Sequence, residues 1–265
     1  MLKYKVKKIA VLVSGGVRIY PKNKLFLKKI FKGLDVKIIA CIWKSQKKTK
    51  IFKKLYNVEY NKYINLQKWN RYMSKVTYVT GEENRSYKVV NIFHMWYSIV
   101  ENLKFLKKIR NENFDYVCRF RSDLYFKDSK KNLLKEILKI KDNQLIFPEN
   151  NHYRGLNDQF FIGNYATVMK FTNFFKFIKS FLKEKRTLNP EYLLYFFLRK
   201  NNIKYKIVES FKIKVLGQNL KSHLNYSIKP SKKAFVPLKD KINMKTLKYK
   251  MRLIKINRKI QKILN

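Results

Sequence analysis

The sequence has few of the residues that cross-link extracellular domains or hold structural metals. Its 265 residues include two cysteines, three histidines, five prolines and seven glycines. Cys41 and Cys118 lie in the apolar stretches IIACIW and YVCRF, so we expect small core residues rather than a disulfide or a metal site. No Cys-x-x-Cys or His-Glu-x-x-His spacing occurs, which argues against a zinc site. This cysteine usage fits a reducing compartment.

Long apolar runs and several well-known catalytic motifs are also missing. The longest apolar runs, such as YLLYFFL at 192–198, fall short of the roughly 18 residues that would span a bilayer. The run IAVLV near the start is too short for the hydrophobic region of a signal peptide. We therefore expect a cytoplasmic protein, or one peripheral on the inner face of a membrane. No G-x-G-x-x-G, Walker or G-x-S-x-G motif is present, which argues against dinucleotide-binding, NTPase and serine hydrolase classes.

Acidic residues are scarce, and the chain carries a large positive charge. Sixty-two Lys+Arg against 17 Asp+Glu give a formal net charge of +45. Such an excess ordinarily indicates nucleic acid, an anionic membrane or a phosphorylated substrate as partner. However, only 11 of the cations are Arg, and the lysines accompany many Asn, Ile, Phe and Tyr residues, whose codons are AT-rich. We therefore expect no specific nucleic-acid partner, and keep a non-enzymatic nucleic-acid-binding protein as an alternative.

Short apolar runs alternate with segments of helical periodicity along the chain. The runs that predict strands lie at 8–14, 35–43, 76–80, 114–126, 144–150, 159–164 and 203–210. Residues 86–109 carry apolar positions every three or four residues, which is typical of a long amphipathic helix. Residues 45–75 predict a helix and a loop, and a further helix is expected to begin near Pro190. This alternation predicts an α/β domain with a mostly parallel sheet flanked by helices, and such sheets bind ligands beyond the carboxyl ends of their strands.

The clearest candidate site is formed by Arg119, Arg121 and Asp123, at the end of the expected strand over 114–126. Alternate residues of a strand point to one face, so these three side chains should lie in a row. Arginine donates bidentate hydrogen bonds to phosphate oxygens, and aspartate offers a hard oxygen ligand to Mg²⁺ or Mn²⁺. The alternative is a salt-bridge ladder that joins the sheet to a helix. We favour a ligand site because burying charges for structure alone is costly or neutral.

The order of several segments resembles bacterial and viral glycosyltransferases of the GT-A type, which build polysaccharide or lipopolysaccharide. These segments are SGGVR (14–18), MWYSI (95–99), FDYVCRFRSDLYF (114–126), LIFPEN (145–150) and GLNDQFFIGN (155–164). The resemblance covers roughly residues 8–210. It implies a Rossmann-type GT-A fold and transfer of a sugar from a nucleotide-diphosphate donor to a glycan or lipid-linked acceptor. A nucleotidyltransferase on a similar sheet is the competing enzyme class, but no Gly-rich, Lys-containing loop follows the first strand.

The sequence departs from the family at the metal-binding motif. GT-A enzymes usually carry Asp-x-Asp at the end of the corresponding strand, where it holds a divalent metal against the donor diphosphate. Here the first position is Arg121, so Asp123 remains as the candidate ligand for Mn²⁺ or Mg²⁺. Alternatively, the arginines neutralise the diphosphate themselves.

The resemblance also implies roles for two other polar segments. After the first strand, Ser14, Gly15 and Arg18 should approach the nucleoside and diphosphate, because glycine permits close backbone approach and Arg18 adds charge. Inverting sugar transfer needs a carboxylate near the acceptor hydroxyl, and Asp158 is the first candidate for that base. Its alternative role is an Asx-turn. Glu191 is the runner-up, although acidic residues are also favoured in a first helical turn.

The last segment, residues 239–265, has no acid after Asp240 and can form a basic amphipathic helix. Such a helix could lie on an anionic leaflet, or form a solvated tail. We therefore divide the chain into a GT-A-like domain at 1–238 and a basic C-terminal extension at 239–265.

Overall fold

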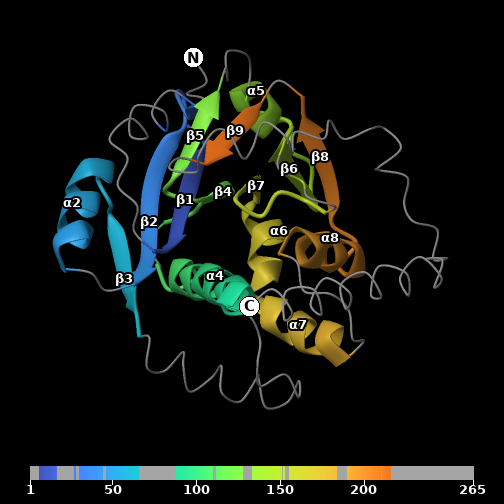
Figure 1. The fold of residues 1–265 in the computed structure, drawn as a ribbon. Coiled ribbons are helices and arrows are strands. Elements are labelled where there is room, and N and C mark those ends of the chain that lie inside the picture. Colours follow the sequence, from blue (N-terminus) through green and yellow to red (C-terminus); the bar gives the residue numbers. More distant parts are fainter. Residues whose placement is uncertain are drawn as a thin grey trace. The chain divides into compact units, whose positions relative to one another are not determined.

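The computed structural model of this protein describes most of the chain up to residue 215 (Figure 1). The described residues are 6–16, 27, 30–43, 46–65, 87–109, 112–127, 133–150, 152, 155–183, 190–209 and 211–215. Arg18, the expected strand at 76–80 and the expected extension at 239–265 lie outside them. No helix within the described ranges is long and apolar enough to cross a membrane.

A mixed sheet of seven strands forms the centre of the described part of the chain, in the order β3-β2-β1-β4-β7-β6-β8 (Figure 1). Its strands are β1 (Lys8–Gly15), β2 (Asp35–Trp43), β3 (Tyr60–Ile64), β4 (Tyr116–Phe120), β6 (Gln144–Pro148), β7 (Phe160–Asn164) and β8 (Lys204–Val208). All neighbouring pairs are parallel except those of β7, which runs antiparallel to β4 and β6. The predicted α/β class with a mostly parallel sheet is confirmed.

Helices flank this sheet. They are α2 (Gln46–Tyr56), α4 (Tyr87–Leu106), α5 (Leu133–Leu138), α6 (Tyr165–Met169), the 3-10 turn η1 (Lys170–Asn173), α7 (Phe174–Lys183) and α8 (Pro190–Lys200). The expected helix over 86–109 is confirmed as α4, which packs against β1 and β2. The helix expected near Pro190 is confirmed as α8, with the proline at its first position.

The expected strand over 114–126 is wrong in its extent, because it is two strands joined by a turn. β4 ends at Phe120, and the turn is closed by a 3.0 Å hydrogen bond from the backbone N–H of Leu124 to the carbonyl of Arg121. The chain then continues as β5 (Leu124–Lys127), which pairs antiparallel with β9 (Lys212–Val215) in a separate small sheet. Neither β9 nor β3 was expected from the sequence, which placed a helix and a loop at residues 45–75.

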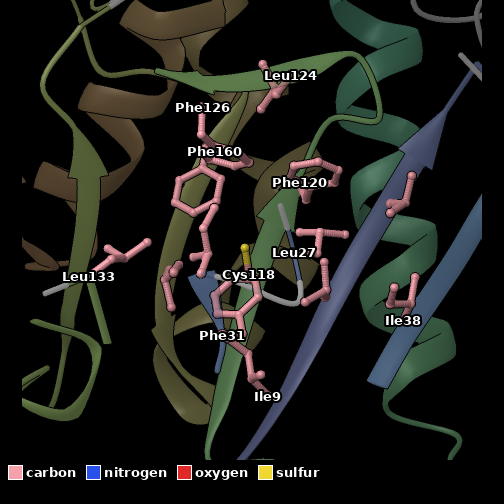
Figure 2. Close-up of a cluster of buried hydrophobic side chains, with 14 of the residues drawn as sticks. Ile9, Leu27, Phe31, Ile38, Cys118, Phe120, Leu124, Phe126, Leu133 and Phe160 are labelled. Atoms are coloured by element: carbon pink, nitrogen blue, oxygen red, sulfur yellow. The ribbon is translucent and has the colours of Figure 1, made fainter. Parts of the chain in front are cut away.

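Apolar side chains from both sheets form one core. Alternate residues of β1, Ile9, Val11 and Val13, point into it. Figure 2 shows Phe120 and Phe126 beside each other in this core, and their ring centroids lie 5.9 Å apart. Packing across the turn at 121–123 therefore fixes where that turn lies. Cys41 and Cys118 are free and buried, which confirms them as core residues.

The opposite face of the central sheet is covered by an aromatic cluster. Phe161 of β7 stacks on Phe171 of η1 at 5.2 Å between centroids, and Trp96 of α4 stacks on Phe174 of α7 at 3.9 Å. These rings join the sheet to α4, η1 and α7 as one packed layer. Arg119 projects toward this face, because its neighbours in β4 belong to the other core and successive strand residues alternate.

Candidate functional site

Three polar segments of the chain meet at one edge of the central sheet. β1 and β4 are parallel and end there, whereas the antiparallel β7 begins there. The register pairs Val13 with Phe120 and Phe120 with Phe160. Residues 14–16, 121–123 and 157–159 therefore lie together beyond the carboxyl ends of the parallel strands. This is the edge at which open α/β sheets bind their ligands.

Arg121 and Asp123 form a bidentate ion pair across the turn after β4. Nε of Arg121 donates to Oδ1 of Asp123 at 2.6 Å, and Nη2 donates to Oδ2 at 2.8 Å. The carboxylate is 2% exposed, whereas the guanidinium is 26% exposed. Burial acts to lower the pKa of Arg121, but the hydrogen bonds and charge of Asp123 raise that pKa overall. Arg121 therefore stays charged, and its side chain is the more exposed member of the pair.

Arg119 lies deeper than the sequence predicts. It is 1% exposed, and Nη1 donates to the carbonyl of Phe120 at 3.0 Å. Its Nε and Nη2 have no hydrogen-bond partner among the described residues. Burial lowers the pKa of Arg119 to about 10, against the raising effect of the charge on Asp158, so the guanidinium remains charged at neutral pH. The expected row of three side chains along one strand is wrong, because Arg121 and Asp123 lie in the turn.

The segment before β7 is ordered by Asn157. Its Oδ1 accepts hydrogen bonds from the backbone N–H groups of Gln159 at 2.9 Å and Phe160 at 3.2 Å, which is an Asx-turn. Its Nδ2 donates to the carbonyl of Asn150 at 2.8 Å. The sequence allowed Asp158 to make an Asx-turn, but in the structure Asn157 makes it.

Asp158 is buried beside both guanidiniums. The residue is 4% exposed. Burial raises the pKa of the Asp158 carboxyl, while the charges of Arg121 and Arg119 act to lower it. A carboxyl group with a raised pKa is suited to accept a proton near neutral pH.

Glu191 reaches the same site from the start of α8. It is 7% exposed, and its charge acts on Arg121. Its carbonyl accepts a 3.0 Å hydrogen bond from the backbone N–H of Leu156. The chain approaches so closely that a Cβ at Gly155 would lie 2.2 Å from the Glu191 carbonyl. The two candidate bases are therefore brought to the same edge by one backbone contact.

The end of β1 is held by a residue of α4. Nδ2 of Asn102 donates to the carbonyl of Val13 and to Oγ of Ser14, both at 3.0 Å. Gly15 has φ +96°, a conformation that glycine adopts without strain. β1 ends at this residue, and the expected contact of Ser14 and Gly15 with a nucleotide stays a prediction. Sequence reasoning missed Asn102, although an amide among the apolar positions of an amphipathic helix was a usable signal.

His152 and Asn150 are two further residues that the sequence did not single out. Nε2 of His152 lies 2.8 Å from the carbonyl of Pro148, and Nδ1 accepts from the backbone N–H of Asn157 at 3.3 Å. Asn150 exchanges two hydrogen bonds with the backbone of Ile213, at 2.7 and 2.9 Å. The ring of His152 therefore joins the segment that carries Asp158 to the end of β6, while the side chain of Asn150 binds β9 and its carbonyl binds Asn157. The polar run after the apolar LIFP was the available signal.

The donor set at Asp123 does not fit a divalent metal in this arrangement. Both carboxylate oxygens already accept hydrogen bonds from Arg121. Within the described ranges, no group of three or more His, Cys, Asp or Glu residues is arranged to hold a metal ion. A Mg²⁺ or Mn²⁺ ion at Asp123 would have to share both oxygens with Arg121, without a cluster of further ligands among the described residues.

No family model matches the sequence, and no curated protein matches it. Among solved structures, the glycosyltransferase GlyE of Streptococcus pneumoniae aligns with 76% of this chain at 13% identity and a TM-score of 0.43. The galactosyltransferase LgtC, solved with donor and acceptor sugar analogs, aligns with 76% of this chain and 73% of its own at 11% identity and a TM-score of 0.43. The chain spans 45% of the length of GlyE. Likeness at this level says nothing of reaction or substrate.

Proposed function

We propose that this protein is a glycosyltransferase that moves a sugar from a nucleotide-diphosphate donor to a glycan or lipid-linked acceptor. The observation that carries the proposal is the meeting of two guanidiniums and three carboxylates at the ligand-binding edge of the sheet. These groups belong to Arg119, Arg121, Asp123, Asp158 and Glu191. The resemblance of the surrounding segments to GT-A enzymes supports the same assignment.

The cationic groups would bind the donor. Arg121 is the accessible guanidinium, and its charge-assisted hydrogen bonds suit the diphosphate oxygens. Arg119 adds a buried positive charge behind it. Ser14 and Gly15 lie at the adjacent end of β1, where the backbone can approach the nucleotide closely.

The buried carboxylates would act on the acceptor. In an inverting transfer, the acceptor hydroxyl oxygen forms a bond to the anomeric carbon while the bond from that carbon to the diphosphate oxygen breaks. The hydroxyl proton passes to Asp158, whose raised pKa makes it a competent base. Glu191 is the second candidate for the base, and a retaining transfer would need neither residue for that step.

Assignment to polysaccharide or lipopolysaccharide synthesis at the inner face of a membrane is part of the same proposal. A lipid-linked acceptor would make membrane docking useful, and the basic segment at 239–265 would supply it.

Ligand binding provides the first test of the proposed function. Thermal stability is measured with UDP, GDP, CMP and TDP sugars. The nucleotide sugar that binds should stabilise the protein by about 2.7 kcal/mol when its concentration is a hundred times its Kd. Each charge-assisted contact contributes about 1.5–3 kcal/mol, so Arg121→Ala should weaken the selected nucleotide by about tenfold or more. Arg199→Ala, at an exposed position of α8, is the matched control. Stabilisation by polyanions alone, without nucleotide selectivity, would contradict the proposal.

A further inference from the structure

The ion pair of Arg121 and Asp123 bears on how a diphosphate would be neutralised, given the proposed function. Asp123 uses both oxygens to fix the plane and position of the guanidinium. This geometry leaves Nη1 of Arg121 for a ligand, on a side chain that is a quarter exposed. A guanidinium held in this way loses little side-chain entropy on binding phosphate, because its geometry is already fixed.

Arg119 provides a second, independent observation. Its Nε and Nη2 are buried and have no hydrogen-bond partner among the described residues. Leaving charged donors desolvated is costly unless something accepts from them or balances their charge. The charges of Asp158 and Asp123 act on this guanidinium, so it lies beside the same site. An anionic group of a ligand would supply the acceptors that the described residues lack.

The carboxylates of the site reduce its positive charge. Asp123, Asp158 and Glu191 all act on Arg121, so the described site is not strongly cationic before a ligand binds. The pKa of Asp158 is raised, however, which disfavours its charged form when further negative charge arrives. Three carboxylates therefore stand against two guanidiniums, and the case for diphosphate binding rests on the fixed geometry of Arg121 and the unpaired donors of Arg119 rather than on net charge.

We propose that this site binds the diphosphate of its donor without a divalent cation, through the guanidinium of Arg121, with Asp123 acting as the residue that positions it. By the resemblance to GT-A enzymes, Arg121 takes the position of a metal-binding aspartate, and the remaining Asp123 accepts hydrogen bonds from that arginine. In this arrangement Asp123 is a positioning residue and not a metal ligand.

Isothermal titration of UDP, GDP, CDP and TDP tests this inference, with EDTA in one series and Mn²⁺ or Mg²⁺ in the other. We expect one nucleotide to bind with a Kd that differs by less than about threefold, or about 0.7 kcal/mol, between the two series. Lysine cannot reproduce the bidentate fork, so Arg121→Lys should weaken binding about tenfold in both series. Asp123→Asn should weaken binding to a similar extent with and without the metal, because it loosens Arg121.

The controls and the contrary outcomes separate this inference from the proposed function. Arg199→Lys and Asp142→Asn lie at exposed positions outside the site and should leave the nucleotide affinity unchanged. Nucleotide binding that requires Mn²⁺ or Mg²⁺ in the wild type, and that the metal no longer strengthens in Asp123→Asn, would overturn the inference. The glycosyltransferase proposal would still stand. Paramagnetic resonance measures Mn²⁺ binding to the nucleotide-free protein. We expect the wild type and Asp123→Asn to bind Mn²⁺ equally, because Asp123 is not a ligand. No nucleotide binding in either series would overturn the proposed function itself.

Discussion

Gly155 should accept no larger side chain, because the backbone of α8 occupies the space. A Cβ at this position would lie 2.2 Å from both the carbonyl carbon and the oxygen of Glu191, and 2.5 Å from the backbone nitrogen of Tyr192. These atoms belong to a helix and cannot rotate away as a flexible side chain would. Gly155→Ala therefore has to push the 155–159 segment away from the start of α8.

The cost follows from the contacts that this displacement breaks. Loss of the hydrogen bond between Leu156 and Glu191 leaves two buried backbone groups unpaired, at about 1–3 kcal/mol. Displacing packed backbone adds about 1–3 kcal/mol. We therefore expect the free energy of unfolding to fall by about 2–6 kcal/mol, a large part of the 5–15 kcal/mol typical of a domain.

Equilibrium unfolding in urea, followed by circular dichroism, measures this change. Gly16→Ala is the matched control, since nothing lies within 4 Å of its added Cβ, and it should change stability by less than about 1 kcal/mol. The same displacement separates the segment of Asp158 from Glu191, so transfer activity should fall more than nucleotide affinity. Wild-type stability of Gly155→Ala would show that the segment does not rest on α8, and the description of the site would be wrong.

Three further outcomes test the site and the charge of the chain. Asp158→Asn leaves the Asx-turn of Asn157 intact, so turnover should fall by about 10²-fold or more with little change in donor affinity; near wild-type turnover would shift the role to Glu191 or to a retaining mechanism. Burial lowers the pKa of His152 from 6.5, so the unfolded chain takes up this proton at a higher pH than the folded protein, and stability should fall as the pH drops below about 6.5. His152→Gln should reduce the change in the urea midpoint over that pH range, and an unreduced change would contradict the assignment. Binding to duplex DNA should be weak, without sequence preference and lost at moderate ionic strength, whereas tight selective binding at physiological salt would overturn the glycosyltransferase proposal.

The sequence was sufficient for the fold class because the strands of a parallel sheet are buried on both faces. The runs at 8–14 and 35–43 are continuously apolar, and both are strands with buried centres. β3 was not predicted, because its sequence YNKYI is half-exposed at the edge of the sheet, where polar residues are tolerated. β9 has only four residues and pairs with β5, which lies far away in sequence. The alternation of KIKV is the period of a strand, but it extends over too few residues to stand out in a lysine-rich chain.

The site was located from the sequence more readily than its internal contacts. The carboxyl-end rule directed attention to residues 121–123 and 157–159, and the structure places both segments at the same edge of the sheet, whereas their role as a site stays a prediction. It could not show that Arg121 and Asp123 face each other across a turn, since the alternation rule holds only within a strand. Nor could it divide the roles of Asn157 and Asp158, because both residue types make Asx-turns. Those assignments depend on local geometry that residue spacing does not encode.

The charges of the described residues divide into two kinds. Lysines pair with acids in partly exposed positions near the amino ends of the strands, as in Lys7 with Asp115 at 2.7 Å and Lys8 with Glu112 at 2.8 Å. Exposed pairs of this kind are screened by salt and contribute little to stability. In the candidate site beyond β1 and β4 the cations are Arg119 and Arg121, and Arg121 pairs with a carboxylate that is 2% exposed. The net charge of +45 therefore describes the lysine-rich composition of the chain, whereas the chemistry we propose depends on two arginines that contribute little to that total.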